Sequence, residues 1–481
     1  MRYPINRRQV LRLAGLATAG AFVASNAGSR AFAQAATRHA PFLPFLRRLP
    51  IRRTEPGLVE AAIIAVPHAL RVGGERARLW NYNGSFPGPV LEVKEGDHVR
   101  LHFINHLPEE TNLHLHGLHI SPAVDNPFLS VPRGESVFYE FTVPQGSRGL
   151  HWYHPHVHGH VATQLFAGLA GPILVRSSED DGLSDADDRL IVLKDLELLN
   201  GQPAPHGVVD WLRGKEGNLR LVNGALDPVL VAKRGLLRLR FLNASNARYY
   251  RLALQEHALH LVATDGHLLA EPVALDEILL APGERAEALV SLEREGRFAL
   301  LDLPYDRGAG MMHMGGMGGG PGRDPVRLMT VVAPAGLDAR PIPSSLAAVE
   351  DFRHAPPDVT RRLILGEGMM MRGSFTINGR AFDPERVDLA SRLDSLEVWE
   401  VENRGGMDHP FHLHTYPFQV LSRNGFPEAV VVWKDVANVR PGETVRIAVP
   451  LRDFTGRTVY HCHIVEHEDR GMMGTLEVTP G

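Results

Sequence analysis

The sequence contains one cysteine, Cys462, in 481 residues. A single thiol excludes any disulfide within the chain. Aromatic residues make up only 7% of the chain, whereas 47 glycines and 35 prolines are present, a composition typical of short strands joined by many turns. Beyond residue 33 no apolar run is long enough to cross a membrane. We therefore expect a mature protein rich in β-strands, without a membrane segment.

The chain also lacks an excess of basic side chains. Its 51 Lys and Arg residues are outnumbered by 55 Asp and Glu residues, which gives a net charge of -4. This balance argues against a nucleic acid as partner, because a phosphate backbone is bound by a basic surface. The length predicts two to four domains. The 25 histidines are many for this length, so metal binding is the first function to test.

The first 33 residues predict an export leader. An Arg7-Arg8 pair resembles the twin-arginine signal, the run from Leu13 to Ala24 is apolar, and Ala31-Phe32-Ala33 has the small-x-small pattern of a cleavage site. A membrane anchor is the alternative, but the run is short and rich in alanine. We therefore expect the mature protein in the periplasm, where a lone thiol is a liability unless a metal occupies it.

A distant threefold repeat divides the rest of the chain. Asn-Gly opens each copy and Gly-Glu precedes a later strand, as Asn83-Gly84 with Gly134, Asn223-Gly224 with Gly283, and Asn378-Gly379 with Gly442. The segments that follow alternate between apolar and polar residues, as half-buried strands do. The repeat predicts three antiparallel, Greek-key β-sandwich domains at 50–177, 189–334 and 359–481, with little helix apart from a short one within 161–169.

Histidines spaced two residues apart occur in the first and last copies of the repeat, and the middle copy has none. The pairs are His114 with His116, His154 with His156, His412 with His414, and His461 with His463. Equivalent positions carry them, because His114 lies 30 residues after Gly84 and His409 lies 30 residues after Gly379. The simplest arrangement is one shared site between the first and last domains. Eight imidazoles suit a cluster of about three copper ions.

The stretch around Cys462 predicts a second metal site joined to the first. On a strand, Cys462 points to one face, and His461 and His463 point to the other. His467 follows five residues after the cysteine, and Met472 follows ten residues after it. A thiolate, imidazoles and an axial thioether form the ligand set of a blue-copper electron-transfer site. Met473 is a rival axial ligand, although the spacing favours Met472.

These motifs resemble those of the multicopper oxidases, in particular the bacterial three-domain laccase-like and cuprous-oxidase branch. The resemblance covers nearly the whole chain after the leader. It rests on His-Leu-His-Gly (114–117), His-Pro-His-Val-His-Gly (154–159), His-Pro-Phe-His-Leu-His (409–414) and His-Cys-His-x-x-x-His-x-x-x-x-Met (461–472). It implies an all-β chain of three consecutive cupredoxin-like domains, with no copper ligand in the second.

The resemblance also implies four copper ions and a role for each ligand. The mononuclear type 1 copper takes His409, Cys462 and His467, with Met472 as axial ligand. The type 2 copper takes His114 and His412. The type 3 pair takes His116, His154, His156, His414, His461 and His463. Asp125 and Glu468 match acids that assist dioxygen reduction and proton delivery, and Cys462 carries the electron between the sites.

The implied activity is oxidation of a small reducing substrate, coupled to reduction of dioxygen to water, by a monomer. Methionine clusters at 311–317 and 369–371 favour Cu(I) as the substrate, because thioethers select it. The near absence of a long Met-rich insert favours phenols and aromatic amines instead, and Asp435 is expected to contact such a substrate. The alternatives are a copper-binding, copper-tolerance protein without turnover, a copper nitrite reductase, and a copper-free cell-division relative.

Overall fold

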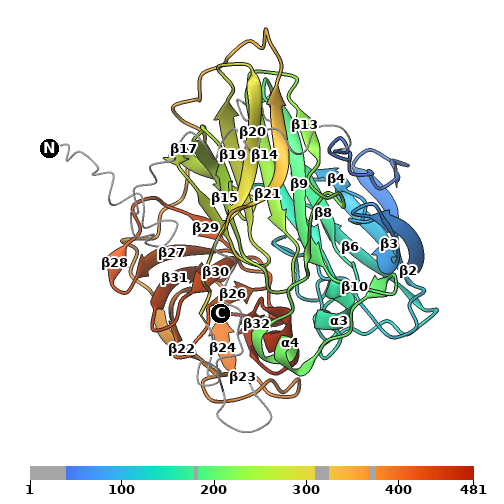
Figure 1. The fold of residues 1–481 in the computed structure, drawn as a ribbon. Helices are drawn as coiled ribbons and strands as arrows, with labels where there is room; N and C mark the ends of the chain where they lie inside the picture. The colour runs from blue at the N-terminus through green and yellow to red at the C-terminus, as the bar shows by residue number, and fades with distance from the viewer. Residues whose placement is uncertain (1–39, 178–182, 309–323, 368–374) are drawn as a thin grey trace, which may run out of the picture.

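The computed structural model describes residues 40–177, 183–308, 324–367 and 375–481 (Figure 1). Within these ranges the chain is built from strands, with only three short helices. This architecture confirms the predicted all-β fold class. The expected leader and the methionine clusters at 311–317 and 369–371 lie outside the described residues.

The first third of the chain, strands β1 to β8, forms two sheets. One sheet contains β1 (Ile51–Arg52), β2 (Leu58–Val72), β3 (Glu75–Tyr82), β5 (His98–Asn105) and β6 (Ser136–Thr142). The other contains β4 (Leu91–Lys94), β7 (Gly149–Tyr153) and β8 (Gly171–Arg176). Inward-facing residues such as Val99, Leu101 and Phe103 alternate with more exposed ones along β5, as expected for a strand buried on one face.

The middle third, strands β9 to β21, forms two larger sheets. The first contains β9 (Asp187–Leu196), β12 (Leu219–Val222), β14 (Leu236–Asn243), β16 (Leu259–Thr264), β17 (His267–Leu275) and β19 (Arg285–Ser291). The second contains β13 (Val229–Val231), β15 (Tyr250–Leu254), β18 (Ile278–Leu280), β20 (Gly296–Leu303) and β21 (Val326–Ala333). Two short strands, β10 (Leu198–Leu199) and β11 (Gln202–Pro203), form a hairpin before helix α4 (Val208–Arg213).

The last third, strands β22 to β33, again forms two sheets. The first contains β22 (Val359–Glu367), β23 (Phe375–Ile377), β25 (Leu396–Asn403), β27 (Phe418–Arg423), β28 (Phe426–Pro427), β29 (Trp433–Lys434) and β31 (Thr444–Pro450). The second contains β24 (Leu389–Arg392), β26 (His409–Leu413), β30 (Val436–Val439), β32 (Gly456–Cys462) and β33 (Met473–Thr479).

Equivalent asparagines give the three thirds the same turns. The backbone φ values of Asn83, Asn223 and Asn378 are 54, 51 and 53°, in the left-handed region that asparagine tolerates. Each side chain accepts a hydrogen bond from a strand amide, of Ile64 at 2.9 Å, Val192 at 2.8 Å and Ile364 at 2.8 Å respectively. The glycine amides donate to matching asparagine carbonyls, Gly134 to Asn105, Gly283 to Asn243 and Gly442 to Asn403. The repeat is therefore structural, while the exact domain limits 50–177, 189–334 and 359–481 stay predictions.

The helices lie where the thirds meet. Helix α3 (Val161–Phe166) falls within the predicted 161–169 segment and packs against α5 (Val465–Asp469), which follows directly on Cys462. The Asp469 carboxylate accepts hydrogen bonds from the Gly159 and Ala162 amides at 2.7 and 2.8 Å and ties the two helices together. The first and last thirds are thereby held together, and Figure 1 shows the first third at the right and the last third below the middle third.

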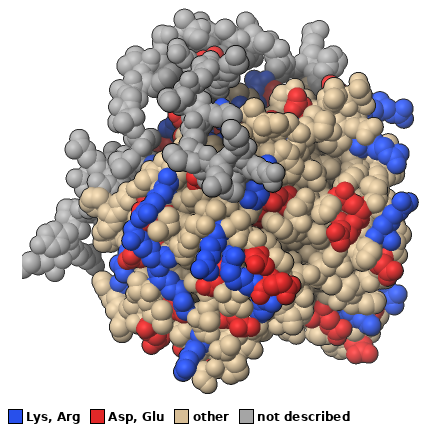
Figure 2. Space-filling view, turned by 90° about the horizontal axis from the view of Figure 1, so that it is seen from below, with Lys and Arg blue, Asp and Glu red and all other residues tan. Residues whose placement is uncertain are grey.

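The surface shows no strong preference for one sign of charge on the face drawn in Figure 2, where acidic and basic side chains are interspersed outside the grey atoms. Among the described residues, no helix is long and apolar enough to span a bilayer.

Candidate metal centre

One candidate site lies in the last third, around Cys462 at the end of β32. Strand β26 begins with His409 and pairs with β32, so the sheet places His409 beside the cysteine, and α5 returns His467 to the same point. The Cys462 Sγ lies 3.5 Å from His409 Nδ1 and 3.8 Å from His467 Nδ1. The two imidazole nitrogens are 3.3 Å apart. All three side chains are fully buried, so one thiolate and two imidazoles converge away from water.

Both candidate axial methionines are buried close by. The Met472 carbonyl accepts a hydrogen bond from the Cys462 amide at 3.0 Å, and Met472 belongs to the same buried apolar cluster as Cys462. Met473 starts β33 and pairs with His461, outside that cluster. This packing favours Met472 over Met473.

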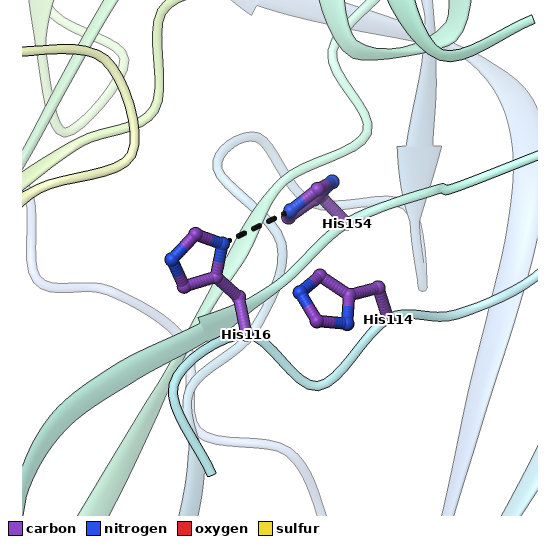
Figure 3. Close-up of side chains that lie close together, drawn as sticks. All are labelled: His114, His116 and His154. Carbon is purple, nitrogen blue, oxygen red and sulfur yellow. Dashed lines mark hydrogen bonds between the residues drawn. The ribbon is translucent and has the colours of Figure 1, made fainter. Parts of the chain in front are cut away.

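The four histidine pairs meet in a second site between the first and last thirds. His114 Nε2 lies 3.4 Å from His412 Nε2, and His461 Nε2 lies 3.1 and 3.2 Å from the Nε2 atoms of His414 and His156. Within the first third, His116 and His154 approach to 3.4 Å beside His114 (Figure 3). None of the eight predicted side chains is more than 3% exposed: His114, His116, His154, His156, His412, His414, His461 and His463.

Outward hydrogen bonds orient most of these rings. The Nδ1 atoms of His154, His412 and His461 lie 2.9, 2.7 and 3.0 Å from the backbone carbonyls of Pro155, Asp435 and Cys462, which leaves each Nε2 facing inward. His116 is reversed, because its Nε2 lies 2.9 Å from Asp435 Oδ1 and its Nδ1 faces the cluster. A hydrogen bond on one ring nitrogen fixes the other as the metal ligand.

The donor atoms fit a metal ion that prefers nitrogen and sulfur. Burial, followed by neighbouring imidazoles, lowers the pKa of His154 and His412 well below 6.5, and burial lowers the pKa of His461 to about 3, so the rings are neutral as ligands must be. Burial raises the pKa of Cys462, so its thiolate needs a bound cation. Both ring nitrogens of His463 lack a hydrogen-bond partner although the ring is fully buried. Copper satisfies this donor set.

The two predicted carboxylates also lie at the cluster. Asp125 Oδ2 lies 2.8 Å from His114 Nδ1, and Asp125 Oδ1 accepts a hydrogen bond from the Leu115 amide at 2.9 Å. Glu468 lies 3.3 Å from His156 Nε2 and 3.2 Å from His461 Nδ1. Burial raises the pKa of Glu468 well above 4.5, which favours the protonated form of its carboxyl group.

The expectation that Asp435 contacts a reducing substrate is wrong. Only 2% of Asp435 is exposed, and its carboxylate lies between His116 and Arg285 in the interior. A side chain enclosed by these two partners has no surface left for a substrate.

Sequence reasoning missed three residues at the two sites, of which two touch predicted ligands and one binds Asp435. Trp152 stacks on His154 with ring centroids 4.2 Å apart, Phe375 stacks on His467 at 3.9 Å, and Arg285 holds Asp435. No local signal marks them, because an isolated aromatic or arginine on a strand is common. Of the remaining histidines, His119 binds the Thr415 carbonyl and Asp453, and His206 binds Glu466 in the interior.

Within the described ranges, five groups of His, Cys, Asp and Glu side chains are arranged to hold a metal ion. One is the Cys462 site. The other four share members of the histidine cluster, and Asp435 joins one of them. The two sites are therefore separate but adjacent, joined by the peptide of residues 461–463.

Comparison with known proteins agrees with this geometry. Three family models, each described as multicopper oxidase, match residues 64–180, 152–309 and 354–481. The multicopper oxidase mco of Staphylococcus haemolyticus is 35% identical over 409 residues, which cover 83% of each chain. The cell division protein FtsP of Edwardsiella tarda is 30% identical and covers 99% of both chains.

A solved structure extends the likeness to three dimensions. The multicopper oxidase of Campylobacter jejuni, a metallo-oxidase, superposes with a TM-score of 0.84 at 32% identity, covering 92% of this chain and 96% of that one. The chain therefore belongs to the multicopper oxidase family, copper-containing oxidoreductases that use oxygen and a reducing substrate.

Proposed function

We propose that this enzyme couples one-electron oxidation of a phenol, an aromatic amine or Cu(I) to four-electron reduction of dioxygen to water. One observation carries the proposal. Cys462 Sγ lies 3.5 and 3.8 Å from His409 and His467, while the residues on either side of it, His461 and His463, belong to the buried histidine cluster. One peptide bond on each side of Cys462 thus joins the electron-accepting site to the proposed site for dioxygen.

The ligand assignment is the one that the resemblance implies, and the donor atoms that face each other support it. The mononuclear type 1 site would be held by His409, Cys462, His467 and Met472. The type 2 site would be held by His114 and His412, whose Nε2 atoms face each other at 3.4 Å. The type 3 pair would be held by His116, His154, His156, His414, His461 and His463. Four bound copper ions would supply the one-electron redox changes and the binding of dioxygen.

The protein's own residues supply orientation and protons. Reduction of dioxygen to two waters consumes four protons, which buried carboxyl groups can deliver. Glu468, whose pKa is raised by burial, lies beside His156 and His461 of the cluster. Asp125 lies beside His114 and holds its ring. We assign proton delivery to Glu468, and orientation of His114 and assistance in dioxygen reduction to Asp125.

Electrons must reach the Cys462 site through protein. His409 and His467 are fully buried, and α4 packs against α5, which carries His467. A donor therefore binds outside these rings and transfers electrons across intervening atoms, which suits phenols, amines and Cu(I) alike. The predicted twin-arginine leader supports a periplasmic location, where such donors and dioxygen meet.

The test measures oxygen uptake by the copper-loaded enzyme with a phenol, an aromatic amine and Cu(I), alongside a Cys462→Ser variant. We expect a strong blue absorption and one dioxygen consumed per four electrons, both abolished by Cys462→Ser without loss of the fold. A protein that binds copper but consumes no oxygen with any donor would instead be a copper-tolerance or storage protein. A protein that fails to bind copper would resemble a structural cell-division relative.

A further inference from the structure

Arg285, at the start of β19 in the middle third, reaches into the histidine cluster although the middle third supplies no predicted copper ligand. We propose that Arg285 and Asp265 are positioning residues, which fix His116 and His412 of the cluster by holding Asp435 between them. The proposal rests on the ligand assignment given above. It assigns the middle third a direct part in building the oxygen-reducing site.

The guanidinium of Arg285 is completely buried, and all its donors are used. Nη1 and Nη2 donate to the two carboxylate oxygens of Asp435 at 2.6 and 2.5 Å. Its remaining N–H groups donate to the backbone carbonyls of Leu150 at 3.1 Å, Gly283 at 3.2 Å and Asp265 at 3.0 Å. Leu150 belongs to the first third and Asp435 to the last, so one side chain from the middle third binds both of the others.

The Arg285–Asp435 pair acts on two ligand rings at once. Asp435 Oδ1 lies 2.9 Å from His116 Nε2, and the Asp435 carbonyl lies 2.7 Å from His412 Nδ1. His116 therefore presents Nδ1 to the cluster, and His412 presents Nε2. A bidentate arginine fixes the plane of a carboxylate, so Asp435 can accept from His116 in only one direction.

Asp265 also binds the Arg285–Asp435 pair. Its Oδ1 accepts the Arg285 amide at 2.8 Å, and its Oδ2 accepts the amides of Asp435 and Val436, each at 3.2 Å. The Lys434 ammonium also lies 3.2 Å from Oδ2. Both the backbone and the side chain of Asp435 are thus fixed by residues of the middle third.

The side chains around Arg285 are closely packed. A side chain at Gly117, directly after His116, would place its first carbon 2.3 Å from Arg285 Nη2. Two buried carboxylates, Asp265 and Asp435, face this arginine, and removing it would leave Asp435 without its main counter-charge and Asp265 with Lys434 alone. Residues that orient metal-ligating histidines typically change metal affinity or activity by about 10- to 100-fold when they are replaced.

The experiment compares copper-loaded wild-type enzyme with Arg285→Met and Arg285→Lys. Arg240→Met is the matched control, because Arg240 is equally buried in the middle third and pairs with Asp188 and Glu287. The measurements are copper content per chain, the type 2 electron paramagnetic resonance signal, the near-ultraviolet absorption of the type 3 pair, and the blue absorption of the Cys462 site.

We expect Arg285→Met to weaken copper retention at the cluster at least tenfold and to change the type 2 signal, while the blue absorption stays within twofold of wild type. Arg285→Lys should recover part of this loss, and Arg240→Met should leave all the signals unchanged. If Arg285→Met does not fold, Asp265→Asn is measured in its place and should change the same cluster signals.

Cluster signals in Arg285→Met, or in Asp265→Asn in its place, that match those of Arg240→Met would overturn the proposal. Equal loss of blue absorption and cluster signals would also overturn it, since this would be a general structural effect. A wild-type protein that shows no copper signals at all would contradict the proposed function itself. Failure of the proposed function is therefore distinguishable from failure of the positioning role.

Discussion

The Nε2 atoms of His114 and His412 lie 3.4 Å apart although the two residues are 298 positions apart in the sequence. Neither third of the chain that supplies them holds a complete cluster. The site exists only after the first and last thirds have packed together, and a metal bound there would join them. Metal binding and docking of the thirds should therefore be coupled.

Removal of copper should lower the stability of the whole protein. The folded chain buries His463 without a partner for either ring nitrogen and buries the Cys462 thiol, and bound copper would satisfy both. A ligand present at about 1,000 times its Kd adds about 4 kcal/mol, which corresponds to roughly 4 °C in Tm for a chain of 481 residues that unfolds as one unit. Calorimetry of copper-loaded and chelator-treated protein checks this. An unchanged Tm after complete copper removal would contradict the coupling.

The axial position of the Cys462 site should distinguish two neighbouring methionines. We expect Met472→Leu to shift the reduction potential of the blue site, because the axial ligand tunes it, and to leave its colour strong. Met473→Leu is the matched control, since Met473 is equally buried but pairs with His461 on β33. Redox titration followed by the blue absorption measures both. A shift in the control alone would assign the axial role to Met473.

Glu468 should control how turnover depends on pH. Burial raises its pKa well above 4.5, so below that raised pKa its carboxyl group holds a proton that it can deliver. As the pH rises through the raised pKa this donor form is lost, and the rate with a donor that releases only electrons should fall. Glu468→Gln should lower turnover by roughly 100-fold and lack this fall with rising pH.

The control for Glu468 is Glu466→Gln on the same helix. Glu466 is also fully buried, but its carboxylate accepts hydrogen bonds from His206 and Asn246. Its replacement should keep the wild-type pH profile. A Glu468→Gln enzyme with that same profile would remove the proton-donor assignment.

The sequence predicted the parts of the molecule that leave a local pattern. The His-x-His pairs and their equal distances from Gly84 and Gly379 gave the shared cluster, and alternation along the strands gave the all-β fold. The role of Asp435 was misjudged, because its burial depends on His116 and Arg285, which are distant in the sequence. Arg285 left no pattern at all, since its partners Leu150, Asp265 and Asp435 come from all three thirds of the chain.

The three equivalent glycines of the repeat allow a sharp test of how closely the middle third approaches the cluster. Gly134, Gly283 and Gly442 have φ values of 85, 84 and 71°, so alanine at any of them costs about 1–2 kcal/mol of backbone strain. At Gly134 and Gly442 an added carbon meets nothing within 4 Å, but at Gly283 it would lie 2.7 Å from the His463 ring. Without copper, Gly134→Ala and Gly442→Ala should therefore lose similar stability, and Gly283→Ala should lose more because His463 must also shift.

Only Gly283→Ala should also disturb the metal site, because its new methyl group displaces His463. We expect a reduced near-ultraviolet absorption of the type 3 pair and a lower copper content in this variant, with a blue absorption close to that of Gly134→Ala and Gly442→Ala. Copper analysis and absorption spectra of the three proteins measure these effects. If all three variants keep the same cluster signals, His463 has room to move, and the middle third does not constrain the site at this point.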